Sequence, residues 1–223
     1  MKRYAIILLA VTMPLLVNSQ ASAQQDETKK FEVGAQFSML GIADEFDEGF
    51  GTRAEPGVGG RFTFNLTEKL SLEAETNFFP RNDRATAFRS GGRAVESFFG
   101  VKFGKRFQKF GVFAKARPGL ISFSQGLTVL TPTGTTTGSF PIFNLRFERL
   151  THFAFDLGGV VEFYPSRRIF FRLDAGDTVI RYGQTTMNDF TLSSSGSLVS
   201  TPISVPGDTR HNFQLSTGVG FRF

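Results

Sequence analysis

Residues 212–223, Asn-Phe-Gln-Leu-Ser-Thr-Gly-Val-Gly-Phe-Arg-Phe, alternate polar or small side chains with apolar ones and end on an aromatic residue. A period of two residues is typical of a β-strand whose two faces lie in different surroundings. One face carries large apolar side chains and the other carries amides, hydroxyls, glycines and one arginine. The apolar face holds Phe213, Leu215, Val219, Phe221 and Phe223.

The N-terminus has the pattern of an export signal. Lys2 and Arg3 precede an apolar run over residues 5–17, and Ala21-Ser22-Ala23 follows as a small-residue cleavage site. We expect residues 1–23 to be a signal peptide and residues 24–223 to form one domain. A membrane anchor is the alternative, but the run is shorter than the ~20 apolar residues of a spanning helix and contains a proline.

The composition excludes some classes of site and favours an unusual surface. The chain has no cysteine, which excludes disulfides and thiolate metal sites. Its 28 Phe, 24 Gly and absence of Trp accompany a mean hydropathy of −0.07, a value that would ordinarily suggest a soluble protein. A membrane barrel also gives such a value, because only alternate residues of each strand face lipid. An export signal and alternating strands together therefore indicate the bacterial outer membrane.

The same alternation recurs along the whole mature chain. It predicts an all-β fold, an eight-stranded antiparallel up-and-down transmembrane β-barrel, with a bulge or bend at Pro118-Gly119. The connections alternate between long and short, and membrane barrels place their short turns in the periplasm. Both termini are therefore expected to be periplasmic. The third and fourth long connections, residues 124–151 and 183–208, are rich in Thr, Ser, Gly and Pro and are expected to be solvated loops. The strands are expected near residues 31–40, 58–66, 70–79, 95–104, 110–123, 152–163, 169–182 and 209–223.

Charged residues gather on the face opposite the phenylalanines, which is the predicted lumen. An eight-stranded barrel is only wide enough to hold side chains, and buried charges are tolerated when they are paired. We therefore expect an ion-pair network that plugs the lumen, with inward glycines leaving room for it. The expected acids are Glu32, Glu73, Glu75, Glu96, Asp156, Glu162 and Asp174, and the expected bases are Arg61, Lys102, Lys115, Arg117, Arg172 and Arg222.

These features resemble the small outer-membrane β-barrel proteins of Gram-negative bacteria, similar to the membrane domain of outer membrane protein A. The resemblance rests on the cleavage site, the eight strands, the turn at residues 162–168 and the C-terminal Gly218-Val219-Gly220-Phe221-Arg222-Phe223. It implies that Phe223 is a signal for the barrel-assembly machinery. One departure is the aromatic belt, which usually contains Trp and Tyr, whereas the mature chain has only Tyr164 and Tyr182.

The fold class hosts several functions, so function has to be argued from particular residues. A lipid-modifying enzyme would need a nucleophile activated by a histidine. The chain has two histidines, His152 and His211, both expected at the outer rim, and no Gly-x-Ser-x-Gly motif. We therefore expect no enzyme activity and no cofactor; a narrow channel is a further alternative.

Two long connections carry opposite charge. The second is rich in arginine, whose guanidinium group suits the phosphates of lipopolysaccharide; the candidate contacts are Arg81, Arg84, Arg89 and Arg93. The first is acidic, with Asp44, Glu45, Asp47, Glu48 and Glu55, but its spacing does not fit a calcium-binding loop. A solvated charged surface is the plain alternative for both.

The remaining alternatives concern the partner and the solvent. The isoelectric point of about 9.7 would suit nucleic acid, but export and the dispersal of Lys and Arg along the strands argue against that partner. A soluble secreted lipocalin-like barrel would line its cavity with phenylalanine and expose its charges. We expect instead a monomer with a structural or surface-interaction role, in contact with outer-membrane lipid.

Overall fold

The computed structural model describes residues 29–43, 52–82, 89–135, 141–192 and 198–223. The expected signal peptide lies outside the described residues. Within them, no helix is long and apolar enough to cross a membrane. The strands are β1 (Phe31–Ala43), β2 (Thr52–Asn65), β3 (Leu70–Phe79), β4 (Ala94–Arg106), β5 (Phe110–Thr135), β6 (Pro141–Phe163), β7 (Ile169–Tyr182), β8 (Thr185–Leu192), β9 (Leu198–Val205) and β10 (Asp208–Arg222).

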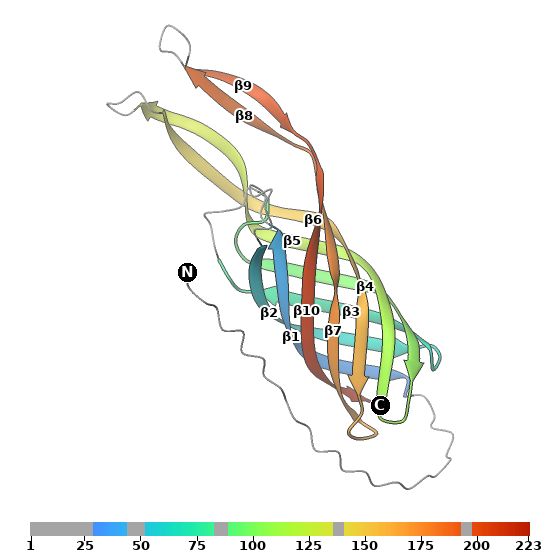
Figure 1. Ribbon diagram of the computed structural model, residues 1–223. Helices are drawn as coiled ribbons and strands as arrows, with labels where there is room; N and C mark the ends of the chain where they lie inside the picture. The colour runs from blue at the N-terminus through green and yellow to red at the C-terminus, as the bar shows by residue number, and fades with distance from the viewer. Residues whose placement is uncertain (1–28, 44–51, 83–88, 136–140, 193–197) are drawn as a thin grey trace, which may run out of the picture.

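Eight of these strands close into one antiparallel barrel in the order β1-β10-β7-β6-β5-β4-β3-β2, which confirms the predicted fold (Figure 1). The C-terminal strand, whose alternation indicates the fold, is the element that closes it, because β10 pairs with both β7 and β1. At the seam Phe31 N donates to Phe223 O at 3.1 Å, and Phe223 N donates to Phe31 O at 2.9 Å. Closure leaves the barrel without a free sheet edge.

The two Thr- and Ser-rich segments predicted to be loops are mostly strand. β5 and β6 continue past the barrel as a hairpin that pairs as far as Thr135 and Pro141, with three register shifts. The fourth connection holds a separate two-stranded sheet, β8–β9. Figure 1 shows both hairpins projecting from the same end of the barrel, opposite the C-terminus. The Thr, Val and Ile residues of these segments favour strands, but the segments show no apolar–polar alternation in the sequence.

The bulge predicted at Pro118-Gly119 is also wrong. Phe98 faces Gly119 and Val101 faces Ala116, so β4 and β5 keep one register on both sides of Pro118. The two positions between these pairs have no ladder partners. Proline has no N–H to donate, and the ladder is interrupted here rather than shifted.

The predicted faces are those of the structure. Phenylalanines of the apolar rows point outward and are extensively exposed, with Phe99 at 60% and Phe213 at 62%. Carboxylates and bases of the opposite rows point inward and are buried. This is the reverse of the lipocalin-like arrangement. A surface so rich in exposed Phe, Val and Leu is untenable in water.

Inward glycines let neighbouring strands and long side chains approach each other. A Cβ at Gly100 would lie 2.3 Å from Ala116 O and 2.6 Å from Arg117 Cα, both backbone atoms. At Gly60, which points outward, the nearest atom to an added Cβ would be Gly34 O at 3.8 Å. The space at Gly100 is therefore required by the backbone of β5.

We predict that Gly100→Ala destabilises the barrel by about 1–3 kcal/mol, the range for overpacking. Gly60→Ala, the matched control, should be neutral or slightly stabilising because alanine has less backbone entropy to lose. The measurement is the midpoint of urea unfolding of each refolded variant. Equal midpoints for the two variants would contradict the assigned packing at Gly100.

Candidate functional site in the barrel interior and at its rims

The inward-facing charges predicted from the alternation all lie in the lumen. Twelve of the thirteen are buried, and Arg222, at the end of β10, is half-buried. All of them except Glu96 gather in the part of the lumen away from the two projecting hairpins, together with neighbouring amides. We call this set the charged layer.

Glu73 on β3 is the centre of the charged layer and is completely buried. Its carboxylate is ion-paired with Arg172 on β7 and lies 3.4 Å from Lys102 Nζ on β4. Arg117 Nη1 on β5 approaches it to 3.5 Å. Lys102 in turn pairs with Glu162 on β6 at 2.5 Å. One carboxylate thereby links side chains from five consecutive strands across the lumen.

Arg117 joins this centre to a second group of acids. Its Nε donates to Asp156 at 2.8 Å and its Nη1 donates to Glu75 at 2.6 Å. Arg61 holds the same Glu75 carboxylate at 3.0 Å. Further pairs are Arg61–Asp174 at 3.3 Å, Arg172–Asp174 at 2.8 Å, Lys115–Asp156 at 3.0 Å and Lys115–Asp174 at 3.5 Å.

The sequence analysis missed one base of the charged layer. Arg106 Nη2 lies 2.9 Å from Glu32 Oε1 and also donates to Asn65 Oδ1 at 2.8 Å. Arg222 shares the same Glu32 oxygen at 3.2 Å. Arg106 lies two residues past the predicted strand end at Gly104, and continuing the alternation by one step would have included it. With Arg106 the predicted seven acids and six bases become seven of each.

Glu96 is the exception among the inward acids. No basic side chain of the described residues lies within ion-pair distance of it, although it is completely buried. Asn77 Nδ2 and Gln214 Nε2 both donate to its Oε1, at 2.7 and 2.6 Å, while its Oε2 has no hydrogen-bond partner. Its direct hydrogen-bond partners are neutral amides. One of them, Gln214, also accepts from Thr178 Oγ1 at 2.6 Å. Gln36, Ser38 and Ser216 extend this neutral polar layer.

The lumen nearest the projecting hairpins is apolar, which the sequence analysis did not predict. Its buried side chains form one cluster from β1, β3, β4, β5, β6 and β7. The members are Leu40, Ile42, Phe79, Ala94, Phe98, Ile121, Phe123, Ala154, Ile180 and Tyr182. Inward and outward positions are both apolar in these stretches, so no alternation marks them. We call this cluster the apolar layer.

A short segment, residues 89–93, closes the mouth above the apolar layer. Arg89 and Ser90 are buried, and Gln125 N donates to Gly91 O at 3.0 Å. The Arg89 guanidinium lies 5.0 Å from the Tyr182 ring centroid, and His152 Nε2 is 3.2 Å from Arg89 O. Gly92 has a φ of 78°, which a residue with a side chain rarely adopts. His152 is therefore part of the closed mouth.

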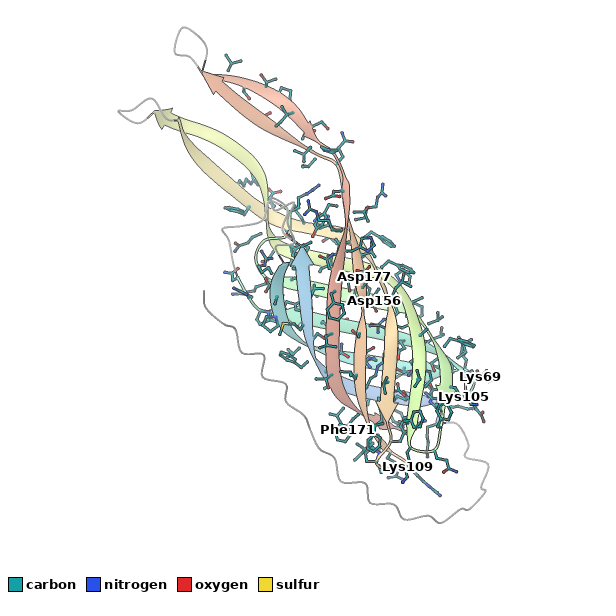
Figure 2. All side chains as sticks on the ribbon, in the orientation of Figure 1. Lys69, Lys105, Lys109, Asp156, Phe171 and Asp177 are labelled. Atoms are coloured by element: carbon teal, nitrogen blue, oxygen red, sulfur yellow. The ribbon has the colours of Figure 1, made fainter. Side chains whose placement is uncertain are left out.

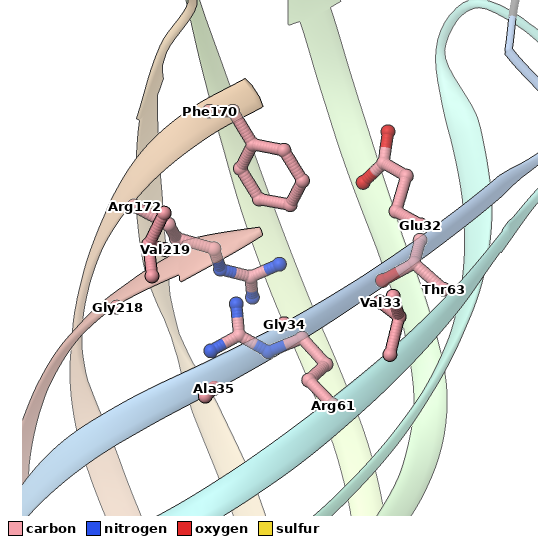
Figure 3. Close-up of a pocket in the computed structure, with 10 residues that line it drawn as sticks. All are labelled: Glu32, Val33, Gly34, Ala35, Arg61, Thr63, Phe170, Arg172, Gly218 and Val219. Carbon is pink, nitrogen blue, oxygen red and sulfur yellow. The ribbon is translucent and has the colours of Figure 1, made fainter. Parts of the chain in front are cut away.

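A small pocket lies among the side chains of the charged layer. Figure 3 shows a pocket between the Glu32–Arg61–Thr63 side and the Phe170–Arg172 side of the lumen. Its volume is about 10 Å³, counted as the space open to the centre of a water molecule. That is room for about one water molecule.

The arginines proposed for lipopolysaccharide contact do not form one surface. Arg89 is buried in the closed mouth. Arg81 and Arg93 are exposed, and Arg81 Nη1 donates to Ala54 O at 3.2 Å. Arg84 lies outside the described residues. The same is true of Asp44, Glu45, Asp47 and Glu48, whereas Glu55 is buried and ion-paired with Arg53.

A groove at the outer ends of β6 and β7 adds a further arginine. Its volume is about 390 Å³, and it is lined by Arg89, Leu150, Thr151, His152, Phe153, Arg181, Gly183, Gln184 and Thr185. No acidic residue lines it. Arg181 is exposed and has no ion-pair partner among the described residues. It lies across the ladder from Phe153, which is 51% exposed at the upper limit of the apolar outer surface.

The second histidine has a partner that sequence spacing did not reveal. His211 Nδ1 lies 2.5 Å from Asp177 Oδ2 on the neighbouring strand, and the side chains are 74% and 40% exposed. Figure 2 labels Asp177 on this wall of the barrel. No hydroxyl or thiol in the described residues is hydrogen-bonded to His211, so an activated nucleophile is not assembled here. Within the same residues, no cluster of His, Cys, Asp and Glu could hold a metal ion.

No protein-family model matches the chain, and no curated protein matches it. Two solved structures are similar over most of its length. A major outer membrane protein from Thermus thermophilus gives a TM-score of 0.51 at 15% identity, covering 87% of this chain and 98% of that one. Neisserial surface protein A gives 0.50 at 12% identity, with coverages of 86% and 97%. At such identities the likeness is one of fold: the chain has the fold of the small eight-stranded β-barrel proteins of bacterial outer membranes.

Proposed function

We propose that this protein resides in the bacterial outer membrane as a monomeric barrel with a structural or surface-interaction role. The observation that carries the proposal is the orientation of the two faces. Large apolar side chains cover the outer wall on every barrel strand, and charges are confined to the lumen and the ends. Hydrocarbon is the solvent that such a wall requires, and a closed barrel satisfies its backbone hydrogen bonds within it.

The lumen is proposed to be plugged rather than conducting. Three layers support this: the charged layer, the neutral layer around Glu96 and the apolar layer under residues 89–93. Water and ions would have to displace paired charges and then cross buried Leu, Ile and Phe side chains. A narrow channel is the alternative, and it would require the apolar layer to open.

We propose that the barrel works without catalysis and without a cofactor. The Asp177–His211 pair is the arrangement that favours the rival function, a lipid-modifying enzyme, because an acid-oriented histidine is one part of a hydrolytic site. No hydroxyl among the described residues is hydrogen-bonded to its histidine, and a hydrolytic site needs such a nucleophile. The pair is better explained as an interfacial contact between β7 and β10.

The proposed orientation has the short turns and both termini in the periplasm and the two hairpins outside. Phe223 is then available to the barrel-assembly machinery. Its ring lies 5.9 Å from that of Phe31 and its backbone bonds to the same residue, so it lies at the seam between the first and last strands of the barrel. A signal at the seam could be recognised by the assembly machinery while the first and last strands are not yet paired.

Lipopolysaccharide is the proposed surface ligand at the outer rim. Arg81 and Arg93 are its candidate contacts from the second connection, and Arg181 joins them from the groove between β6 and β7. The groove combines a guanidinium group with the apolar side chains of Leu150 and Phe153. A phosphate beside an acyl chain fits that combination.

The location predicts the behaviour of the expressed protein. It should sediment with the outer membrane after separation of the envelope on a sucrose gradient. On gels it should migrate differently before and after boiling, because a closed barrel resists detergent until it is heated. Recovery from the soluble periplasm with a single gel mobility would exclude the proposed location.

The plug predicts unequal effects of two isosteric substitutions. Glu73→Gln leaves Arg172 and Lys102 short of a partner, so it should lower the free energy of unfolding by about 3–5 kcal/mol. Glu96→Gln keeps an acceptor for Asn77 and Gln214 and removes no ion pair, so its cost should be well below that of Glu73→Gln. Urea unfolding in detergent micelles measures both.

The same preparations test conduction. Wild-type protein in a planar bilayer should show no steady current of porin size, and Glu96→Gln should behave alike. A persistent open channel in the wild type would contradict the plugged lumen whatever the stability data show.

For lipopolysaccharide, Arg181→Gln should weaken binding about tenfold, since a charge-assisted hydrogen bond contributes ~1.5–3 kcal/mol. Arg146→Gln is the control, because Arg146 is exposed on the hairpin and already paired with Glu148. Titration of the detergent-solubilised barrel with fluorescent lipopolysaccharide gives both affinities. If Arg146→Gln and Arg181→Gln bind equally well, the groove is not the site.

A further inference from the structure

The end of the barrel away from the hairpins carries an unbalanced positive charge. Its short turns and strand ends are exposed or half-exposed, and the negative groups among the described residues there are Glu68 and the C-terminal carboxylate of Phe223. Figure 2 shows three of the lysines near this end. None of these bases has an ion-pair partner within the described ranges. The set, which we call the basic rim, is Lys29, Lys30, Lys69, Lys105, Lys109, Arg167 and Arg168.

Backbone hydrogen bonds connect each turn of the basic rim to the next strand of the wall. Carbonyl oxygens of the basic residues themselves accept these bonds. The contacts are Asn65 N to Lys30 O at 2.8 Å, Gly104 N to Lys69 O at 2.9 Å, Tyr164 N to Lys109 O at 2.8 Å and Arg222 N to Arg168 O at 2.7 Å. The backbone of the rim is therefore continuous and fixed, while the charged side chains stay unpaired.

Two turns are further fixed by hydroxyl caps. Thr67 Oγ1 accepts from Leu70 N at 3.0 Å, and Ser166 Oγ accepts from Ile169 N at 3.0 Å. Such side-chain caps stabilise tight turns. The backbone of these two turns is consequently held at the end of the barrel wall.

Phenylalanine rings lie directly beside the basic rim. Phe31 is 5.2 Å from Phe64 and 5.9 Å from Phe223, and Phe107 stacks on Phe110 at 4.5 Å. Lys105 Nζ lies 5.2 Å from the Phe107 centroid. At this end of the barrel wall, exposed phenylalanine rings are thus followed by basic side chains. That order follows a bilayer from hydrocarbon through the interface to the headgroups.

We propose that the basic rim binds the headgroups of anionic phospholipids in the periplasmic leaflet. This inference rests on the proposed outer-membrane location and orientation, and it concerns a different end of the molecule from the lipopolysaccharide contacts. Each Lys or Arg near an anionic bilayer attracts it by an amount that corresponds to about a fivefold change in association. Among the described residues, seven unpaired bases against Glu68 and the C-terminal carboxylate therefore favour anionic over zwitterionic neighbours.

The position of the basic rim along the barrel axis favours lipid headgroups over another anionic partner. The turns are short, and their bases lie next to the phenylalanine rings. A polyanion lying deeper in the periplasm, such as the cell wall, would be reached by longer segments. Headgroup phosphates are the anions at the level of the rim.

The test compares two double variants of the full mature barrel with equal loss of charge. Lys69→Gln/Lys109→Gln removes two bases of the rim whose side chains make no hydrogen bond among the described residues. Arg146→Gln/Arg149→Gln removes two exposed arginines from the opposite end. Electron spin resonance of spin-labelled phosphatidylglycerol and phosphatidylcholine, in reconstituted vesicles, measures the relative association of each lipid with each protein.

The wild type should associate with phosphatidylglycerol several-fold more strongly than with phosphatidylcholine, and added salt should reduce the difference. Lys69→Gln/Lys109→Gln should reduce the preference by a few-fold, and the control should keep it. Equal association of both lipids with the wild type, or an equal loss in the control, overturns the proposal. Rim-dependent cosedimentation with purified cell-wall sacculi, without a lipid preference, would also overturn it.

These outcomes are separable from failure of the proposed location. A protein that does not reconstitute and shows one gel mobility fails as a membrane barrel. A protein that reconstitutes and changes mobility on boiling, but has no lipid preference, supports the proposed location. It contradicts only the proposal that the basic rim binds lipid.

Discussion

The structure depends on closure of the sheet between β1 and β10. In hydrocarbon an unbonded backbone N–H or C=O costs several kcal/mol. A lipid-facing wall is therefore stable only when its last strand pairs with its first. The C-terminal strand performs this closure, and its pairing with β1 runs from Glu32–Arg222 to Leu40–Gln214. Closure also creates the lumen. The inner face of every strand is then confined with seven others, and side chains distant in sequence must satisfy one another.

The lumen solves that problem with a gradient of polarity along the barrel axis. Charges gather at the end with the short turns, amides and hydroxyls follow, and aliphatic and aromatic groups fill the end below residues 89–93. A buried ion-pair network is not by itself a source of stability, because desolvation offsets much of the attraction. What matters more is that its members share partners. Glu73, Asp174 and Arg117 each contact several charged groups, so the loss of one of them leaves several others unpaired. Such a network fixes one register of the strands against alternatives.

How far the sequence predicts this molecule depends on whether a stretch has two different faces. Where one face meets lipid and the other meets the charged layer, as in β3 and β10, the alternation predicts both the strand and its orientation. In the projecting hairpins the sequence has no such alternation, so it does not reveal the strands. Around Leu40, Phe98 and Ile180 the inner face is as apolar as the outer one, so the alternation did not predict the apolar layer. The partners of Glu96 depend on the stagger of strands across the lumen, and the His211–Asp177 contact depends on register; neither can be read from spacing along one chain.

The hairpin formed by the ends of β5 and β6 has a consequence for reach. Each residue of a strand advances the chain by about 3.3 Å, so the dozen residues of β5 beyond Phe123 place the tip roughly 40 Å from the barrel mouth, measured along the strand. Backbone pairing keeps the two strands extended, whereas an unpaired coil of the same composition would span a shorter distance. A partner that met this end of the molecule would therefore reach paired backbone without charged residues, 124–135 and 141–145, well before it reached the barrel wall.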